Sequence, residues 1–223
     1  MQLSLEHRRV GDATIVTCKG RLVAGAEAKA LEDLIEELLP KTKYLVLHLG
    51  EVDSLDSGGL GLLVRYLMRA QRSKVSLSVC ALSPKIDEVL RITKLRPVFT
   101  PYECEADAIA DVYKRDTLGA SQTTVLCVDS STDLTAYLRE MLRAAGYRAI
   151  SAQNLPDAMI LLIATKPKVV LVSSEIAAYH GTRTAEEFHK MTAGRLVTLP
   201  EGFSGRDAAD AAGEVLRAVG AAC

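Results

Sequence analysis

The chain of 223 residues carries 27 basic and 28 acidic side chains, a net charge of −1, and it has no tryptophan and three phenylalanines. This balance excludes an electrostatic surface for nucleic acid or anionic lipid, and the few aromatic side chains exclude a stacking platform for single strands. The apolar runs are far shorter than the ~20 residues that span a bilayer, so we expect no membrane segment.

Short apolar segments alternate with amphipathic segments in the first half. The interval 26–39 has apolar residues on one helical face and ends at Pro40, which cannot continue a helix. The expected elements are, in chain order, strands at 2–8 and 13–19, a helix at 26–39, a strand ending at Leu49, a helix after Ser57, a strand at 75–79, a helix capped by Ser83, a short strand at Val98-Phe99 and a helix at 105–114. They predict a mixed sheet covered on one side by helices.

The segment 52–61, with sequence VDSLDSGGLG, joins the central strand to a helix whose apolar residues recur at i, i+3, i+4 and i+7 from Leu60. Ser57 therefore lies near the positive end of a helix dipole, between a carboxylate and two glycines. We interpret Ser57 as a phosphorylatable switch, although the pattern alone also fits an ordinary N-cap. A nucleophile elbow would need glycine at Leu55, and a Walker loop would need a Gly-Lys-Ser/Thr ending that the segment lacks.

This segment resembles the signature of STAS domains of the anti-sigma factor antagonist family, in which an apolar residue precedes Asp-Ser-(Ser/Thr/Gly)-Gly-Leu-Gly at a strand-to-helix junction. Gly20-Arg21-Leu22 and the runs 89–95 and 98–99 are also similar to that family, so the resemblance covers roughly residues 1–115. The resemblance implies a binding module that regulates transcription, and no enzyme.

The resemblance also implies partners and site residues. In that family an anti-sigma factor serine kinase phosphorylates the serine after the motif aspartate from ATP, and a serine phosphatase removes the phosphate. Here that serine is Ser57, and Gly58 stands where many members have a second hydroxyl, which leaves one acceptor in the loop. The partner-binding residues implied are Asp56, Ser57, Gly58, Gly59 and Arg65. We interpret the glycines as allowing a partner's backbone to approach Ser57 closely.

Three arginines, Arg65, Arg69 and Arg72, lie on one side of the helix after Ser57, at i, i+4 and i+7. They form either a solvated face or a surface that recognises an acidic partner. Both interpretations use the same exposed stripe, and the sequence leaves them open.

The second half begins after a change in composition. Residues 116–122 are small and polar without apolar periodicity, so we expect a linker there, between a STAS domain at 1–115 and a second domain at 123–223. The expected elements are strands at 124–129, 148–151 and 169–172, helices carrying Leu134 and starting at Asn154, and a final helix at about 207–219. Alternating strands and helices predict a doubly wound, flavodoxin-like α/β domain.

The second domain resembles a response-regulator receiver in the segment 128–131 after its first strand and the segment 167–173 at its third. A working receiver needs an acidic pair, an acceptor aspartate and a hydroxyl residue at successive strand ends. This chain has Asp129, Ser130, Ser173 and Thr198 at the first acidic, second acidic, acceptor and hydroxyl positions. One aspartate does not supply the carboxylate oxygens that Mg²⁺ prefers. With 25 residues after Thr198, the resemblance implies a degenerate, truncated receiver-like domain.

The five cysteines show no Cys-x-x-Cys spacing, which favours reduced thiols and argues against a zinc site or a disulfide framework. Residues 1–6 lack a signal pattern, so we expect a cytoplasmic protein. We also expect no metal and no cofactor. The function indicated is an anti-sigma factor antagonist that acts as a phospho-switch. The alternative is a non-switching STAS scaffold or adaptor, whose second domain serves for homodimerisation or for sensing a small ligand.

Overall fold

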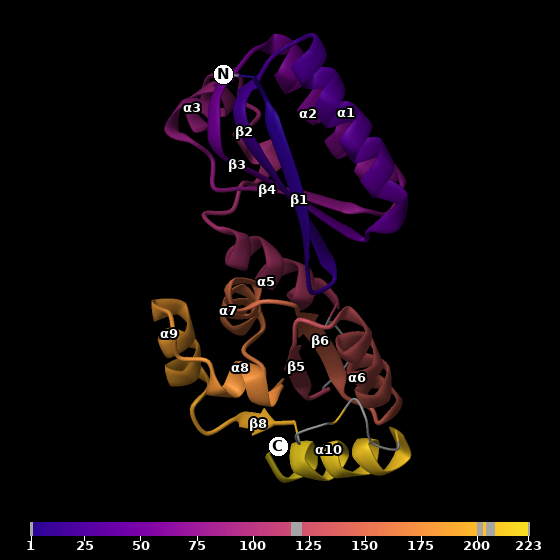
Figure 1. Ribbon diagram of the computed structural model, residues 1–223. Coiled ribbons are helices and arrows are strands. Elements are labelled where there is room, and N and C mark those ends of the chain that lie inside the picture. Colours follow the sequence, from indigo (N-terminus) through magenta and orange to yellow (C-terminus); the bar gives the residue numbers. More distant parts are fainter. Residues whose placement is uncertain (1, 117–121, 200–202, 204–207, 223) are drawn as a thin grey trace. The chain divides into compact units, whose positions relative to one another are not determined.

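The computed structural model describes residues 2–116, 122–199, 203 and 208–222 (Figure 1). The chain divides into two compact units, Met1–Arg115 and Asp116–Cys223. Each unit has a four-stranded sheet of its own in the described residues. Residues 117–121 of the expected linker lie outside the described residues.

The sheet of the first unit is mixed, as the sequence predicts. Its strands are β1 (Ser4–Val10), β2 (Ala13–Leu22), β3 (Tyr44–Leu55) and β4 (Ser76–Cys80), in the order β1-β2-β3-β4. β1 pairs antiparallel with β2, whereas β2, β3 and β4 are parallel. A two-residue turn joins β1 to β2, and Gly11 supplies the positive φ of 60° that such a tight hairpin needs.

The helices of the first unit are α1 (Ala26–Leu38), the 3₁₀ turn η1 (Leu39–Lys41), α2 (Ser57–Arg72), α3 (Pro84–Ile92), α4 (Arg96–Phe99) and α5 (Glu105–Asp116). α1 and α2 lie side by side across one face of the sheet (Figure 1). Their apolar stripes, with Leu31 and Leu63 as members, join α3 and that face in one core. This layer positions the start of α2 beside the end of β2.

Helices cover one face of the sheet, as expected, and the other face is only partly buried, with Arg21 exposed near the end of β2. Val16 and Leu47 are paired residues that enter the core under α1 and α2. Their neighbours Ile15 and Val46 are also paired, point to the opposite face and are fully buried. α5 is tied to this part of the unit, because the backbone N–H of Asp12 donates to the Tyr113 hydroxyl at 3.1 Å.

In the first unit, the expected end of one strand and the expected type of another element are wrong. β3 continues to Leu55 and does not end at Leu49, because its last residues pair with β2 as far as Leu22. Val98-Phe99 is helical and belongs to α4, since a proline at the first helical turn favours a helix start and Thr100, with a φ of 40°, ends it.

The second unit has a wholly parallel sheet. Its strands are β5 (Thr124–Val128), β6 (Arg148–Ala152), β7 (Val169–Val172) and β8 (Leu196–Thr198), in the order β6-β5-β7-β8. The helices are α6 (Thr132–Ala144), α7 (Leu155–Thr165), α8 (Ser174–Ala178), α9 (Arg183–Thr192) and α10 (Ala208–Ala222). This strand order is compatible with the first four strands of a flavodoxin-like sheet.

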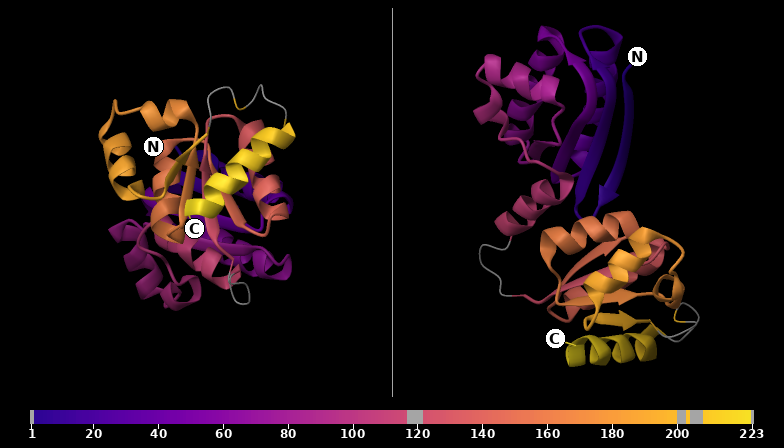
Figure 2. Two further views of the ribbon diagram at one scale, coloured as in Figure 1. Left: turned by 90° about the horizontal axis from the view of Figure 1, so that it is seen from below. Right: turned by 90° about the vertical axis from the view of Figure 1, so that its left-hand side faces the viewer.

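Helices cover both faces of the second sheet (Figure 2). α6 and α10 pack on the face that carries Val125 and Leu171. On the other face, Leu126 and Val170 are fully buried, and α7 contacts both β5 and α9. Because β5, β7 and β8 are parallel and in register, their carboxyl ends lie at the same edge of the sheet.

Candidate functional site

Ser57 is exposed and is the first residue of α2, directly after β3. The sequence predicts this position. The preceding Asp56 has extended backbone angles, with φ −97° and ψ −178°, and caps the helix. The long buried strand β3 thus delivers a hydroxyl to the surface at the positive end of a 16-residue helix.

The carboxylate of Asp56 fixes the turn that carries Ser57. It accepts a hydrogen bond from the backbone N–H of Gly59 at 2.8 Å, and both of its oxygens accept from the backbone N–H of Ala24, at 3.1 and 3.0 Å. The N–H groups of Gly59 and then of Ala24 lower the pKa of Asp56, because they bind the ionised form. The start of α2 is therefore anchored to the loop between β2 and α1.

Gly58 and Gly59 are required by packing inside the unit. A Cβ atom at Gly59 would lie 2.2 Å from the carbonyl oxygen of Leu22, and one at Gly58 would lie 2.6 Å from Cβ of Ala24. Both distances are well below van der Waals contact. The glycines thus let the start of α2 approach the β2–α1 loop, a role that our interpretation of partner approach did not foresee. Gly61 differs, because a Cβ there would meet no atom within 4 Å.

A groove of about 400 Å³ runs between α1 and α2 beside the Ser57 turn. Its small residues include Gly25, Ala28 and Gly61, and its charged residues are Lys29, Glu32 and Arg65. The groove shares Ala24 and Gly58 with the anchored turn. A segment of another protein that lies in this groove would be next to Ser57.

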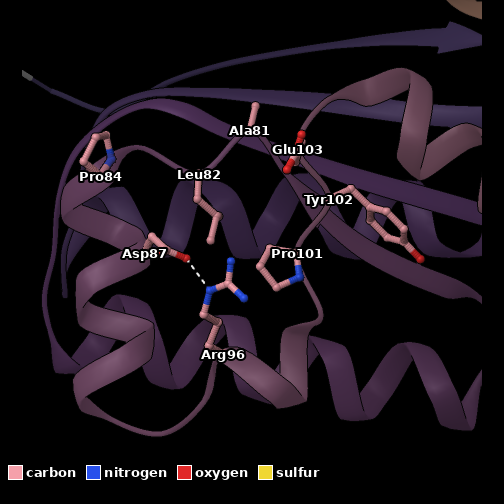
Figure 3. Close-up of a pocket in the computed structure, with 8 residues that line it drawn as sticks. All are labelled: Ala81, Leu82, Pro84, Asp87, Arg96, Pro101, Tyr102 and Glu103. Carbon is pink, nitrogen blue, oxygen red and sulfur yellow. Dashed lines mark hydrogen bonds and ion pairs between the residues drawn. The ribbon is translucent and has the colours of Figure 1, made fainter.

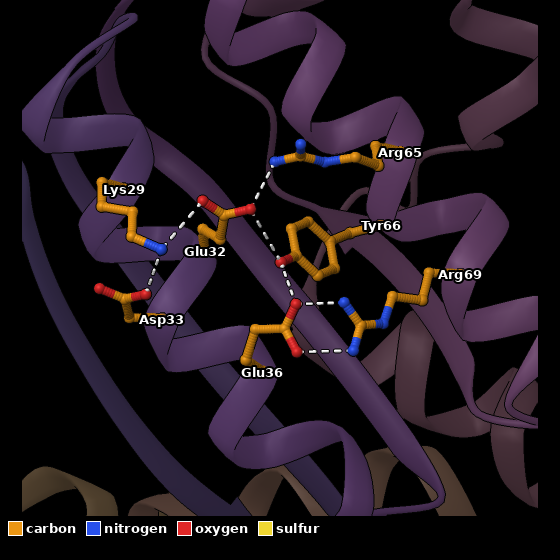
Figure 4. A network of polar contacts seen from close by, with 7 residues as sticks. All are labelled: Lys29, Glu32, Asp33, Glu36, Arg65, Tyr66 and Arg69. Carbon is orange, nitrogen blue, oxygen red and sulfur yellow. Dashed lines mark hydrogen bonds and ion pairs between the residues drawn. The ribbon is translucent and has the colours of Figure 1, made fainter.

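Arg65 and Arg69 both pair with α1 (Figure 4). Arg65 binds Glu32 at 2.7 Å, and Arg69 binds both oxygens of Glu36, one of them at 2.6 Å. Both guanidinium groups also lie over the ring of Tyr66, 5.5 and 5.8 Å from its centroid. The two arginines are exposed but are not unpaired cations, so any acidic partner would have to compete with the glutamates of α1.

The hydroxyl of Tyr66 connects the two ion pairs. It donates to Glu36 at 2.8 Å and lies 3.4 Å from Glu32, while the ring is buried. Burial, and then the bond to Glu36, raises the pKa of Tyr66. The same bond, followed by the pairing with Arg69, lowers the pKa of Glu36. The sequence signal for this network is a complementary spacing: two glutamates at i and i+4 on α1 face two arginines at i and i+4 on α2.

A further cleft of about 340 Å³ lies between the end of β4, α3 and the segment after α4 (Figure 3). Asp87 and Arg96 pair across it at 2.7 Å, and Glu103 also lines it. The lining thus carries two carboxylates and one guanidinium group. This cleft contains none of the residues that the sequence singles out.

The four receiver-like positions of the second unit lie at one edge of its sheet. Asp129 and Ser173 directly follow β5 and β7, and Thr198 ends β8. Val128, Val172 and the last residue of β8 are in register, which places the three strand ends next to one another. Asp129 is buried and accepts a hydrogen bond from the backbone N–H of Ser131 at 2.7 Å. Ser130 is exposed, and so is Thr198.

Within the described residues, no group of three or more His, Cys, Asp or Glu side chains is arranged to hold a metal ion. Burial raises the pKa of Cys18, Cys80 and Cys127 to about 12, so these thiols stay protonated. None of the helices in the described ranges is both long enough and apolar enough to cross a bilayer.

The chain is similar to a family model and to several solved structures. The solved structures that resemble the chain include an anti-sigma factor antagonist from Mycobacterium paratuberculosis, with 23% identity over 50% of this chain and 95% of that one and a TM-score of 0.46. An anti-sigma factor antagonist described as putative, from Thermotoga maritima, shares 24% identity over 49% of this chain and 94% of that one, with a TM-score of 0.46. The phosphorylated form of the Bacillus cell fate determinant SpoIIAA shares 17% identity over 49% and 98%, with a TM-score of 0.40. No curated protein sequence matches the chain. The family model described as STAS domain matches residues 4–108, nearly the whole first unit.

Proposed function

We propose that the chain is an anti-sigma factor antagonist that binds an anti-sigma factor serine kinase, and that phosphorylation of Ser57 switches this binding off. The observation that carries the proposal is the exposed hydroxyl of Ser57 at the first residue of α2, in a turn clamped by Asp56. The match of residues 4–108 to the STAS domain supports it. Partner switching of this kind regulates transcription by releasing or withholding a sigma factor.

In this proposal the chain supplies only the phosphate acceptor. The Ser57 oxygen would form a bond to the γ-phosphorus of ATP held by the kinase, while the bond to the bridging oxygen breaks, ADP leaves and the hydroxyl proton is released. A serine phosphatase would hydrolyse the ester and restore the hydroxyl. Both enzymes need direct access to the Ser57 side chain, and its exposure fits that requirement.

Charge explains why a phosphate would end the complex without unfolding the protein. A phosphoserine adds about −1.5 to −2 charges, and the start of α2 tolerates them because the helix dipole is positive there. Asp53 and Asp56 are exposed beside this position, and Asp56 stays ionised to low pH. A partner that binds here already faces two carboxylates. Two more negative charges would repel it, because the interface excludes the water that would otherwise screen them.

The groove between α1 and α2 is the surface that we propose for the kinase. It adjoins the Ser57 turn, and the missing side chain at Gly61 leaves open space above the backbone of α2. A helix-interior glycine costs about 1 kcal/mol relative to alanine, and contacts inside the unit give no reason for it at Gly61. A closely packed partner segment supplies that reason.

For the second unit we propose a degenerate receiver-like domain that does not take up phosphate. Asp129, Ser173 and Thr198 lie at adjacent strand ends, where a receiver holds its acidic and hydroxyl residues. Ser173 stands at the acceptor position, and Ser130 stands at the second acidic position. A site with one carboxylate would hold Mg²⁺ poorly.

The test uses the full chain, the cognate kinase and radiolabelled ATP. Ser57→Ala is expected to abolish labelling, and the matched variant Ser54→Ala, three residues earlier in β3, is expected to retain it. Labelling of the Ser57→Ala protein at the wild-type level would show that another residue is the acceptor. Equal retention of the kinase by the phosphorylated and unphosphorylated chain would favour a non-switching scaffold.

A further inference from the structure

A separate cleft of about 450 Å³ lies at the far end of α2 from Ser57. Residues at the end of α1, before β3 and in the turn between α2 and β4 line it. α2 has 16 residues and is therefore about 24 Å long, so a small ligand in this cleft could not reach Ser57. The cleft is a candidate site of its own, apart from the kinase surface.

The parallel register of β3 and β4 brings two lysines together in this cleft. Lys43 directly precedes β3, and its carbonyl accepts a hydrogen bond from the N–H of Ser76 at 2.9 Å. Tyr44 and Ser76 are paired residues, so Lys74, two residues before Ser76, lies at the same edge of the sheet. Both lysines line the cleft. Both side chains are exposed, and their two positive charges would attract an anion to this edge of the sheet.

The charge of the lining favours an anion. It contains three cations, Lys43, Lys74 and Arg69, and one carboxylate, Glu36. Arg69 is paired with Glu36, whereas no ion pair involves Lys43 or Lys74 within the described part of the chain. The carboxyl ends of α1 and α2 each contribute roughly half a negative charge, which leaves the cleft with a net charge of about +1. Ser73 adds a hydroxyl donor at the same edge.

We propose that this cleft binds a small oxyanion of the phosphate class, either inorganic phosphate or a small phosphomonoester. Ammonium groups bind phosphate oxygens as compact point charges, and the exposed Lys43 and Lys74 line this cleft together with the Ser73 hydroxyl. None of the described residues that line the cleft is aromatic, so nothing there would stack on a nucleotide base. Glu36 acts against the ligand, because it repels the anion and occupies the guanidinium group of Arg69.

The test measures binding of inorganic phosphate and of glycerol 3-phosphate to the full chain at low ionic strength, by amide chemical-shift titration. Phosphate is expected to shift the amides around Lys43 and Lys74 and not those around Ser57. Acetate, with one charge, is expected to bind more weakly. Preference for glycerol 3-phosphate would identify a phosphomonoester site, and preference for inorganic phosphate would identify a free-ion site. Shifts confined to other parts of the chain would overturn the proposal.

Variants with equal charge changes separate the cleft from general electrostatics. Lys43→Gln with Lys74→Gln is expected to weaken phosphate binding by about tenfold or more. The control is Lys85→Gln with Lys94→Gln, which removes the same charge outside the cleft and includes a lysine with the same φ of 58° as Lys74. This control is expected to bind like the wild type. Equal losses in the two double variants would overturn the proposal.

The glutamates of α1 supply a test with the opposite sign. Glu36→Gln is expected to strengthen phosphate binding by about threefold, because it removes a negative charge and releases Arg69. Glu37→Gln removes the same charge from α1. In the wild type Glu37 pairs with Lys41 and does not line the cleft, so the affinity of this variant for phosphate is expected to be unchanged. Equal affinities in these two variants would count against the assigned cleft.

Discussion

The two carboxylate oxygens of Asp56 both accept from one backbone N–H, that of Ala24, at 3.1 and 3.0 Å. The same carboxylate caps α2 through Gly59. One side chain thus holds together two segments that are more than thirty residues apart in the sequence. The surface around Ser57 is therefore formed by the β2–α1 loop as much as by the start of α2.

The first prediction concerns pH. The folded-state pKa of Asp56 lies below its ordinary value of 3.8, because backbone N–H groups bind the ionised carboxylate. Its charge therefore contributes stability that is fully present above the unfolded-state pKa and is lost as the pH falls through the lower folded-state pKa. Asp56→Asn should be less stable than the wild type near neutral pH, and the difference should shrink below about pH 4.

Denaturant unfolding at a series of pH values measures this difference. Asp53→Asn is the control, because it removes the same charge from an exposed position in β3. Its difference from the wild type should stay small throughout. A pH-independent loss in the Asp56 variant would mean that the hydrogen bonds, and not the charge, stabilise the turn.

The second prediction compares two glycines of α2. Gly59→Ala should lower the free energy of unfolding by about 1–3 kcal/mol, because its Cβ would collide with the Leu22 carbonyl. Gly61→Ala should raise that free energy by up to about 1 kcal/mol, since its Cβ meets no atom and alanine favours the helix. Urea unfolding of both variants checks the two signs. Equal effects would show that the start of α2 can move away from the loop.

The third prediction separates affinity from stability. Ser57→Asp should weaken binding to the anti-sigma factor kinase by at least about tenfold, or ~1.4 kcal/mol, while the free energy of unfolding changes by much less. Gln71→Glu adds one negative charge near the other end of α2 and should bind normally. Calorimetric titration beside denaturant unfolding measures both quantities. An unchanged affinity for the aspartate variant would remove the electrostatic mechanism.

The fourth prediction concerns the second unit. The full chain, incubated with acetyl phosphate and Mg²⁺, should show no phosphorylated species in its intact mass. Ser173 stands where a receiver has its nucleophilic aspartate, and Asp129 is the single carboxylate of the acidic pair. A stoichiometric adduct would mean that this unit is a working receiver with its acceptor at another residue.

The start of α2 could be predicted from the sequence because local signals agree there. A capping aspartate, small residues and a regular apolar spacing all lie within a few residues of Ser57. The end of β3 could not be predicted in the same way. The residues after Leu49 stay in the strand because β2 is long enough to pair with them as far as Leu55, and a local pattern does not report the length of a neighbouring strand.

The role of the glycines could not be predicted for a related reason. The atoms that exclude a side chain at Gly58 and Gly59 belong to Leu22 and Ala24, which are distant in the sequence. The pairing of Arg65 with Glu32 was missed as well, because the matching i, i+4 spacing of the two helices does not by itself show that the helices lie side by side. Local spacing identified which residues face outward from α2, but only the packing of α1 beside it shows which of them are engaged.

The close packing of Gly58 on Ala24 limits whether a second phosphate acceptor could arise in this loop by substitution of Gly58. A serine at position 58 would place its Cβ 2.6 Å from Cβ of Ala24, so the exchange is blocked while that methyl group is present. Removing the methyl group relieves the closest contact and leaves Cα of Ala24 at 3.1 Å. A route to a doubly modified loop would therefore pass first through a smaller residue at position 24, in a segment that carries no acceptor itself.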